Sequence, residues 1–189
     1  MYCISCKGVN YLKSLPGPNT SNSEKQQQQR QRFKAITGLA SSLMGALIRP
    51  VWNLASGQMT GYNLFVKTNM PAFDSEGQLV NYSEFHASVG SLPLPSELSV
   101  QDDTDVVSGI ELSWNDESAN GIGHADDKLH LLVIKGDQVQ VVHPSAIRSD
   151  QTVEVTLPVA PGEIQVYAFF GDDEGSQYST DQYGSVTLT

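Results

Sequence analysis

The sequence predicts an α+β protein in which an N-terminal helical hairpin with an arm precedes an antiparallel β-sandwich. Two changes of pattern support this fold class. Apolar residues between positions 33 and 48 recur at steps of three and four, the spacing of an amphipathic helix. From about residue 80 the apolar period becomes two, and turn residues recur every 8–12 positions, which is typical of a sandwich.

Residues 1–22 are expected to form an extended arm, because Leu15-Pro16-Gly17-Pro18-Asn19 interrupts regular structure. Cys3 and Cys6 form a single C-x-x-C in this arm. A zinc site needs about four ligands, and neither a second C-x-x-C nor suitably spaced histidines supply them. A redox C-x-x-C belongs in a βαβ unit, which the pattern does not indicate. Two free thiols are favoured, and a disulfide between chains is the alternative.

Residues 23–71 are expected to be a helical region. Ser23 is a good N-cap, and Glu24 in the first turn suits the helix dipole. The helix over residues 24–48 begins polar and becomes amphipathic, so it should project from the body at its start and dock at its end. Arg49-Pro50 should end or kink it. The expected docking stripe consists of Phe33, Ile36, Ala40, Leu43 and Leu47, widened by Met44 and Ile48.

A second helix is expected at Gly61–Met70, capped by Thr60 and closed by Pro71. Before it, Val51–Ala55 predicts a short helical turn. The two helices should pack as an αα-hairpin, against each other or against the β-sandwich. The expected core anchors of this region are Trp52, Tyr62 and Phe65.

Residues 72–189 predict the sandwich domain. Trp114 on an early strand and Tyr167 on a late one suit an immunoglobulin- or fibronectin-III-like core, although no cysteine pair bridges the sheets. The expected strands are Glu84–Gly90, Glu97–Gln101, Val107–Trp114, Lys128–Lys135, Gln138–His143, Thr152–Leu157, Glu163–Phe170 and Gly184–Leu188.

The charge of −10 is unevenly distributed. Residues 1–70 contain eight basic residues and one acidic residue, a net +7, whereas residues 71–189 contain three basic and twenty acidic residues, a net −17. This dipolar arrangement favours head-to-tail contacts between copies, or a basic arm on an acidic partner. The alternative is that acidic loops only keep the sandwich in solution. A nucleic-acid role for the basic start of the helix is disfavoured, because the acidic remainder would repel phosphates. Those basic residues are Lys25, Arg30, Arg32 and Lys34.

The sequence lacks the usual signatures of catalysis, with neither a G-x-S-x-G nor a phosphate-binding glycine loop. Asp102-Asp103-Thr104-Asp105 is the nearest match to a calcium loop, but it lacks the glycine and terminal glutamate of an EF-hand. Its carboxylates and the other acidic clusters are therefore expected to be solvated turns, with calcium binding or glycosidase chemistry as alternatives. Those other clusters are Asp116/Glu117, Asp126/Asp127 and Asp172/Asp173/Glu174.

Tyr178 and Tyr183 lie near acidic loops and could stack on a sugar ring, although packing within strands is the default expectation. No catalytic, cofactor-binding or metal-ligating residue is therefore predicted.

Short motifs in a fixed order extend over about residues 10–189. They are Lys13-Ser14-Leu15-Pro16, Arg30-Gln31-Arg32-Phe33, Met59-Thr60-Gly61-Tyr62-Asn63 with Asn69, Ser88-Val89-Gly90-Ser91-Leu92-Pro93, Leu112-Ser113-Trp114, Asp126-Asp127-Lys128, Leu157-Pro158 and Ser179-Thr180-Asp181-Gln182-Tyr183-Gly184. In these motifs the chain resembles a family of uncharacterised proteins found mainly in Bacteroidetes. The resemblance implies a helical N-terminal part, a C-terminal β-sandwich and no known activity, and it provides no catalytic residues. The family's longer basic segment before the arm is short here and holds Cys3 and Cys6.

These observations favour a non-enzymatic structural or assembly protein, such as a component of a phage virion or an extracellular fibre, that associates through its N-terminal arm. The alternative is a β-sandwich module that binds a glycan or a protein. The start of the chain has no Sec-type signal, and no stretch approaches 18 apolar residues. We therefore expect no membrane span and synthesis in the cytoplasm, with later incorporation into a particle.

Overall fold

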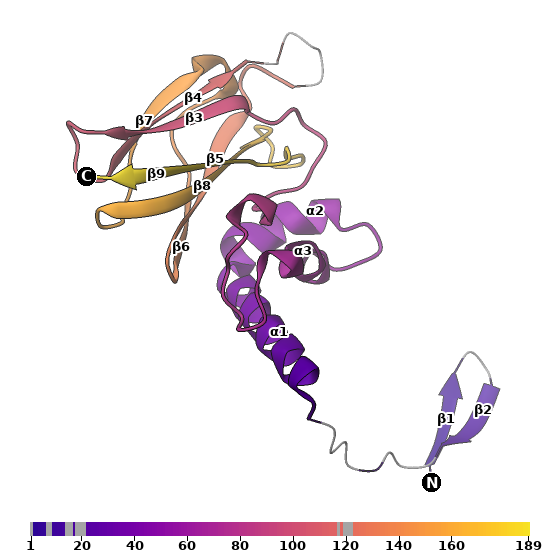
Figure 1. Ribbon diagram of the computed structural model, residues 1–189. Coiled ribbons are helices and arrows are strands. Elements are labelled where there is room, and N and C mark those ends of the chain that lie inside the picture. The colour runs from indigo at the N-terminus through magenta and orange to yellow at the C-terminus, as the bar shows by residue number, and fades with distance from the viewer. Residues whose placement is uncertain (1, 7–8, 14–16, 18–21, 117, 119–122) are drawn as a thin grey trace.

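A computed structural model describes residues 2–6, 9–13, 17, 22–116, 118 and 123–189 (Figure 1). The helical elements are α1 (Glu24–Ser42), a π-helix (Met44–Trp52), α2 (Asn53–Ala55), α3 (Gly61–Asn69) and 3-10 turns at Met70–Ala72, Tyr82–Glu84 and Arg148–Asp150. The strands are β1 (Tyr2–Cys6), β2 (Val9–Lys13), β3 (Ser96–Asp103), β4 (Gly109–Asn115), β5 (Lys128–Lys135), β6 (Gln138–Val142), β7 (Thr152–Thr156), β8 (Gly162–Gly171) and β9 (Gln182–Leu188).

The C-terminal half is a β-sandwich of two antiparallel sheets. One sheet has the strand order β3-β4-β7 and the other β6-β5-β8-β9. In chain order, two strands lie in the first sheet, two in the second, one returns to the first, and two complete the second. This is a Greek-key arrangement of the immunoglobulin and fibronectin-III type, so the predicted fold class is confirmed. Seven of the eight expected strands are present, with ends shifted by at most two residues.

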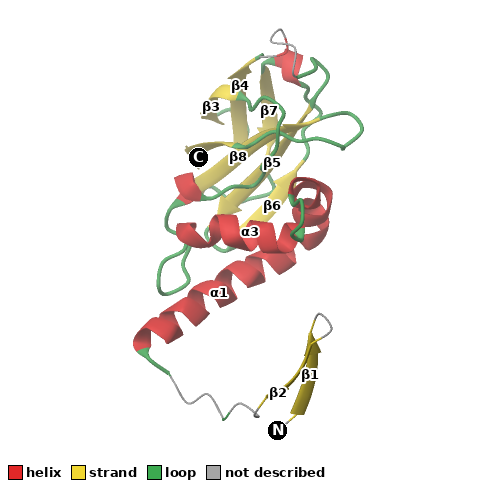
Figure 2. Cartoon of the chain, turned by 90° about the vertical axis from the view of Figure 1, so that its right-hand side faces the viewer, coloured by secondary structure: helices red, strands yellow, loops and turns green. Residues whose placement is uncertain are grey.

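The helices add a third layer on the outer face of the four-stranded sheet (Figure 2). Alternate residues of β8 serve two cores: Val166, Ala168 and Phe170 face the other sheet, whereas Tyr167 and Phe169 face the helices. Because both faces of β8 are covered, its sequence is an almost continuous apolar run rather than an alternating one. Trp114 and Tyr167 are buried as predicted, Trp114 between the sheets and Tyr167 against the helices.

The first helix bends earlier than the sequence predicts. The break was expected at Arg49-Pro50, but α1 ends at Ser42 and the chain turns by 90° into the π-helix, which includes Pro50. The wider π turn starts with the amide of Ile48 bonded to the carbonyl of Leu43, at 3.0 Å. This register avoids the four-residue spacing at which a proline ring clashes with a carbonyl. Proline is therefore accommodated, and the bend moves to the start of the π segment.

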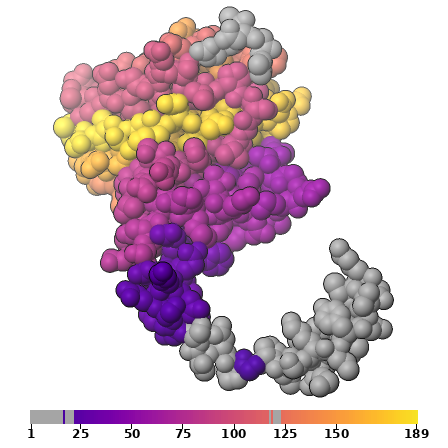
Figure 3. All heavy atoms as spheres, turned by 45° about the vertical axis from the view of Figure 1, so that its right-hand side comes forward, coloured from indigo at the N-terminus to yellow at the C-terminus, as the bar shows by residue number. Residues whose placement is uncertain are grey.

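The docking stripe of α1 is confirmed from Ile36 onward but not at its first residue. Ile36, Ala40, Leu43 and Leu47 are buried, whereas Phe33 is 50% exposed. The N-terminal end of α1 extends away from the sandwich, as expected (Figure 3). In the same half, Arg32 donates to the carbonyl of Asp74 in the loop after α3, at 3.2 Å. Among the described residues no single helix is long and apolar enough to cross a membrane; only Glu24–Ser42 together with the bent Met44–Ala55 segment meets that requirement.

The predicted strand Glu84–Gly90 is wrong. Its alternation of Phe85, Ala87 and Val89 is real, and the first two are fully buried. The segment belongs to no sheet and packs into the core between the helices and the four-stranded sheet. Side chains replace the missing neighbouring strand: Asn69 donates to the carbonyl of His86 at 3.0 Å and accepts from its amide at 2.6 Å. The alternation of apolar residues therefore predicts the buried side chains correctly, but it does not predict that the segment lacks a neighbouring strand.

Residues 1–22 contain a β-hairpin where an extended arm was expected. β1 and β2 pair antiparallel, from Tyr2 opposite Lys13 to Cys6 opposite Val9. In both views the hairpin lies clear of the helices and the sandwich (Figures 1 and 2). Of the expected breaker segment at 15–19, only Gly17 falls within the described residues.

Candidate functional site

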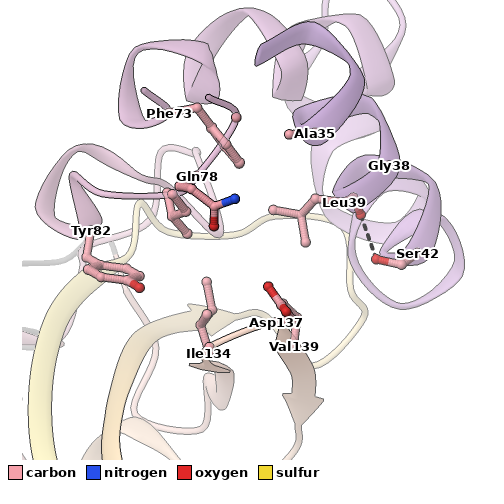
Figure 4. A pocket seen from close by; sticks show the side chains of 13 residues that line it. Ala35, Gly38, Leu39, Ser42, Phe73, Gln78, Tyr82, Ile134, Asp137 and Val139 are labelled. Carbon is pink, nitrogen blue, oxygen red and sulfur yellow. Dashed lines mark hydrogen bonds between the residues drawn. The ribbon is translucent and has the colours of Figure 1, made fainter. Parts of the chain in front are cut away.

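A groove of about 500 Å³ lies where the helical layer meets the sandwich. It is bounded by α1, by the loop that follows α3, and by the β5–β6 hairpin (Figure 4). The lining residues are Ala35, Gly38, Leu39, Ser42, Phe73, Gly77, Gln78, Leu79, Tyr82, Ile134, Gly136, Asp137 and Val139.

Local turn chemistry gives the groove its shape. Asp74 accepts the amides of Glu76 and Gln78 at 2.9 and 2.8 Å, which closes a tight turn around Gly77. Gly77 has a φ of +84°, and a Cβ there would lie 3.1 Å from the carbonyl oxygen of Gln31, so glycine lets the turn approach α1 closely. Across the groove, a Cβ on Gly38 would meet nothing within 4 Å, which leaves the wall of α1 open.

The lining of the groove combines apolar side chains with a few polar groups. Asp137 is the only acidic group in its lining and no basic group accompanies it. Catalysis by acid and base, or by an activated nucleophile, needs at least two such groups within hydrogen-bonding reach. The mixed lining of leucine, valine and isoleucine with amide, hydroxyl and carboxylate groups suits an apolar segment with one polar or cationic end.

A second polar site, a junction, ties the chain after α3 to the residues that precede β9. The carboxylate of Asp181 accepts from the amide of Ser88 at 3.2 Å and lies 3.3 Å from Nδ1 of His86. The hydroxyl of Ser88 donates to the carbonyl of Ser179 at 2.7 Å, so it is not free as a nucleophile for His86. The indole of Trp52 donates to the carbonyl of Ala87 at 2.7 Å. This serine, histidine and aspartate set is a structural clamp.

A buried ion pair lies at the far end of the sandwich. Nε and Nη2 of Arg148 donate to Oδ2 of Asp127 at 3.1 and 3.0 Å, and Nη2 also donates to the carbonyl of Pro93 at 2.9 Å. The guanidinium lies 4.0 Å from the ring centre of Phe170, and both ionic side chains are buried. Asp127 was expected in a solvated acidic turn, and that prediction is wrong for this residue.

Two histidines that the sequence leaves unrelated meet on the four-stranded sheet. Nδ1 of His130 and Nδ1 of His143 are 2.8 Å apart, so one ring donates to the other. His130 also stacks on Phe169 and touches Tyr178. Within the part of the chain that is described, no three histidine, cysteine, aspartate or glutamate side chains lie close enough to hold a metal ion.

The pair of histidines predicts a loss of stability in mild acid. Burial, with smaller contributions from the charges of His143 and Lys128, lowers the pKa of His130 to about 4 from an unfolded value near 6.5. Between these pH values the unfolded chain binds more protons, so the free energy of unfolding should fall by about 1–2 kcal/mol from pH 7 to pH 4.5, allowing for partial exposure. Urea denaturation at several pH values measures this slope.

Two variants separate the contributions to that slope. His130→Gln should flatten the acid loss, whereas His86→Gln should steepen it. The hydrogen bond to Asp181 raises the pKa of His86, so its stabilisation is present below about pH 6.5 and is lost as pH rises through the folded pKa. If the pH dependence of stability is unchanged in His130→Gln, His130 is not the source of the loss in acid.

Other residues singled out in the sequence occupy structural positions. The hydroxyl of Tyr183 donates to Gln165 at 2.5 Å, and its ring centre lies 5.3 Å from that of Tyr167. The ring centre of Tyr178 lies 6.1 Å from that of Phe169, so both tyrosines pack against residues of β8. Trp52 and Phe65 are fully buried anchors as predicted, and Tyr62 is partly buried. Among the acidic clusters, Asp172 holds a turn by accepting from Ser176, and Glu117 lies outside the described residues.

Comparison with solved structures finds similar fibronectin type III domains. Over 52% of its length the chain is similar to the FN1–FN3 domains of chicken CNTN1, with 10% identity and a TM-score of 0.40, and it spans a third (33%) of that protein chain. It is similar to an FN3 domain of human collagen XX over 52% of its length, with 20% identity, a TM-score of 0.35 and 94% of that domain covered. A human fibronectin type III domain containing protein 3 gives 14% identity and a TM-score of 0.35 over 53% of this chain and 87% of the other.

No curated protein sequence matches the chain. The sequence profile of one family, described as a family of unknown function (DUF6266), matches residues 2–184.

Proposed function

The chain belongs to this family of unknown function, and from that premise we propose that it is a non-enzymatic assembly protein whose N-terminal arm binds a second copy. One observation carries the proposal. The arm ends in a two-stranded hairpin that lies clear of the rest of its own chain (Figure 1). An isolated two-stranded hairpin is marginally stable in water, and it becomes stable when a further strand or a packed surface supports it.

The charge distribution supports a second copy as that surface. Residues 1–22 contain two lysines and no acidic residue, and the basic first half of α1 follows them. The sandwich carries most of the twenty acidic residues of positions 71–189. Opposite charges on the two ends of one chain attract the ends of neighbouring copies and speed their encounter.

The same proposal makes the protein a structural component rather than an enzyme. The groove, the clamp at Asp181 and the ion pair at Arg148 each lack a nucleophile or acid with a free base beside it, as far as the described residues go. Repeated arm-to-body contacts would build a fibre or the wall of a virion. On this proposal the protein is made in the cytoplasm and incorporated into such a particle.

A second candidate function is a protein-binding module that uses the groove beneath α1. The observation in its favour is the open wall at Gly38 opposite the carboxylate of Asp137. This candidate needs no arm and no second copy. It therefore predicts a monomer both with and without residues 1–22.

Removing residues 1–22 should convert a salt-sensitive oligomer into a monomer. The truncated chain starts at Ser23, so it keeps the N-cap of α1. Light scattering of both proteins from low to high salt measures the mass, and circular dichroism checks that both are folded. We expect the full chain to be oligomeric at low salt and to dissociate as salt screens the opposite charges. A monomer at every salt and at high protein concentration would reject the assembly role and favour the groove.

A further inference from the structure

We propose that the free edge of β7 receives the β1–β2 hairpin of a second copy as an added strand of the β3-β4-β7 sheet. This inference rests on the proposed assembly function, and it names the surface that the arm binds. The strand order places β7 at one edge of the three-stranded sheet, with β4 on its inner side.

The hydrogen bonds at the two ends of the β4–β7 ladder show which groups of β7 point outward. The amide of Trp114 donates to the carbonyl of Gln151, and that of Leu157 donates to the carbonyl of Ser108, both at 2.9 Å. Antiparallel pairs alternate between bonded and non-bonded, so the bonded residues of β7 are the odd-numbered ones. Thr152, Glu154 and Thr156 therefore direct their amides and carbonyls away from β4, toward a strand that could be added.

The other edges of the sandwich have contacts within the described chain. β3 and β9 lie against each other, and Thr189 bonds to the carboxylate of Asp102 through its amide at 3.2 Å and its hydroxyl at 2.7 Å. At β6, the side chain of Gln140 donates to the carbonyl of Pro158 at 3.3 Å, so the chain that leaves β7 contacts that strand at Gln140. The edge of β7 contains neither proline nor lysine, two of the residues that commonly protect an edge from pairing.

The hairpin fits the edge in length and in the apolar surface that it would cover. β1, β2 and β7 each have five residues, so an added strand can pair along all of β7. Val153 points into the sandwich core but is only partly buried, since nothing lies beyond it in the sheet. Strand addition would satisfy the outward backbone groups, cover Val153 and give the hairpin the further strand that it needs.

The charges of the two surfaces also favour binding of the hairpin to the edge of β7. The strands β3, β4 and β7 contain five carboxylates and no basic residue. Glu111 and Glu154 stand directly opposite each other on the exposed face, and like charges in that position destabilise a sheet. The sequence over residues 2–13 contains two lysines, Lys7 and Lys13, and no acidic residue, so an added hairpin brings positive charge to this acidic face.

The contact joins two different surfaces, which decides the kind of assembly. A hairpin on one copy and an edge on the next form a heterologous contact, which continues into an open chain unless the rotation closes a ring. An open chain of this kind is the geometry of a fibre.

A proline at the outward position of β7 tests the pairing. The amide of Glu154 is not used by β4, so Glu154→Pro should leave the β4–β7 ladder intact, as prolines on edge strands do. We expect this variant to raise the concentration for half-assembly by more than tenfold, while Glu154→Gln, which keeps the amide, should only reduce the salt dependence. Circular dichroism of both variants checks the fold.

Cysteine cross-linking tests the same contact without a proline. Cys3 and Cys6 are the only cysteines of the chain, and both lie in β1. Full-length Thr152→Cys or Thr156→Cys, mixed as two isotopically labelled populations and oxidised, should give disulfides that join β1 of one copy to β7 of the other. Thr187→Cys, also exposed but on β9, is the matched control and should link far less.

The outcomes separate this inference from the function on which it rests. Assembly that needs residues 1–22 but persists in Glu154→Pro, with no link to β7, overturns the docking site and leaves the assembly function standing. Links found only within one chain overturn docking between copies. A full-length protein that is monomeric at every salt and forms no links overturns both.

Discussion

Replacing Asp127 with alanine should lower the free energy of unfolding by about 3–5 kcal/mol, among the largest effects expected of a single substitution in this chain. The change leaves the guanidinium of Arg148 buried without its counter-ion. Arg148 has no exposed side-chain surface and Asp127 only 1%, so water cannot replace the lost carboxylate. Urea denaturation followed by tryptophan fluorescence measures the loss.

The position of the pair explains why the cost should be global. Arg148 packs over Phe170, its carbonyl accepts from the indole of Trp114 at 2.8 Å, and its guanidinium reaches the carbonyl of Pro93. A Cβ on Gly123 would lie 3.1 Å from the guanidinium carbon, so the backbone at Gly123 packs directly against the guanidinium. Four segments that are distant in sequence therefore depend on one charge.

A double variant separates charge from packing. Asp127→Leu combined with Arg148→Met replaces the ion pair by apolar side chains of similar size, and buried pairs replaced in this way often lose little stability. We expect the double variant to recover most of what Asp127→Ala loses. A single-variant loss below about 1 kcal/mol would mean that water reaches Arg148 and that the pair is not sealed.

The sequence predicts the sandwich well because its strands obey local rules. Alternation along β4 marks Ile110, Leu112 and Trp114 as the inward residues, and the structure buries all three. The cap of α3 is equally local: the hydroxyl of Thr60 accepts the amide of Asn63 at 3.2 Å. Such features depend on neighbours within a few residues, so a single chain contains the information.

The features that sequence reasoning missed depend on partners far along the chain. Asp127 lies in a run of acidic residues, and its partner is 21 positions away, so the run alone reads as a solvated turn. Arg148 is the only arginine between positions 71 and 189, and that isolation in an acidic domain was the one available signal. The segment that starts at Phe85 has the period of a strand, but most of its hydrogen bonds are made with the side chains of Asn69, Trp52 and Asp181.

The groove and the free edge of β7 could not be predicted from the sequence either. Gly38 and Asp137 are nearly a hundred residues apart, and only the docking of the helical layer brings them to one groove. An edge strand looks like any other strand until the order of the sheet is known.

Replacing Trp52 with alanine should lower stability by about 3–5 kcal/mol and make the helical layer unfold before the sandwich. Trp52 is fully buried and packs edge-on against Phe65, with ring centres 5.0 Å apart. Phe65 contacts Phe85, which contacts Tyr167 of β8, so a chain of aromatic rings joins the helices to the sheet. Removing its first ring leaves a cavity in the core between the two layers, while the core between the sheets is untouched.

The composition of the chain supplies the probes for this experiment. Trp114 is the only other tryptophan, and it lies in the core between the sheets, so its fluorescence in Trp52→Ala reports the sandwich alone. The helical signal in circular dichroism should disappear at a lower urea concentration than the Trp114 transition. In the matched variant Trp52→Phe, which keeps a ring but loses the hydrogen bond to Ala87, we expect a loss of about 1–3 kcal/mol. If the two transitions coincide in Trp52→Ala, the helices and the sandwich unfold as one cooperative unit. That result would contradict the expectation that the helical layer unfolds first.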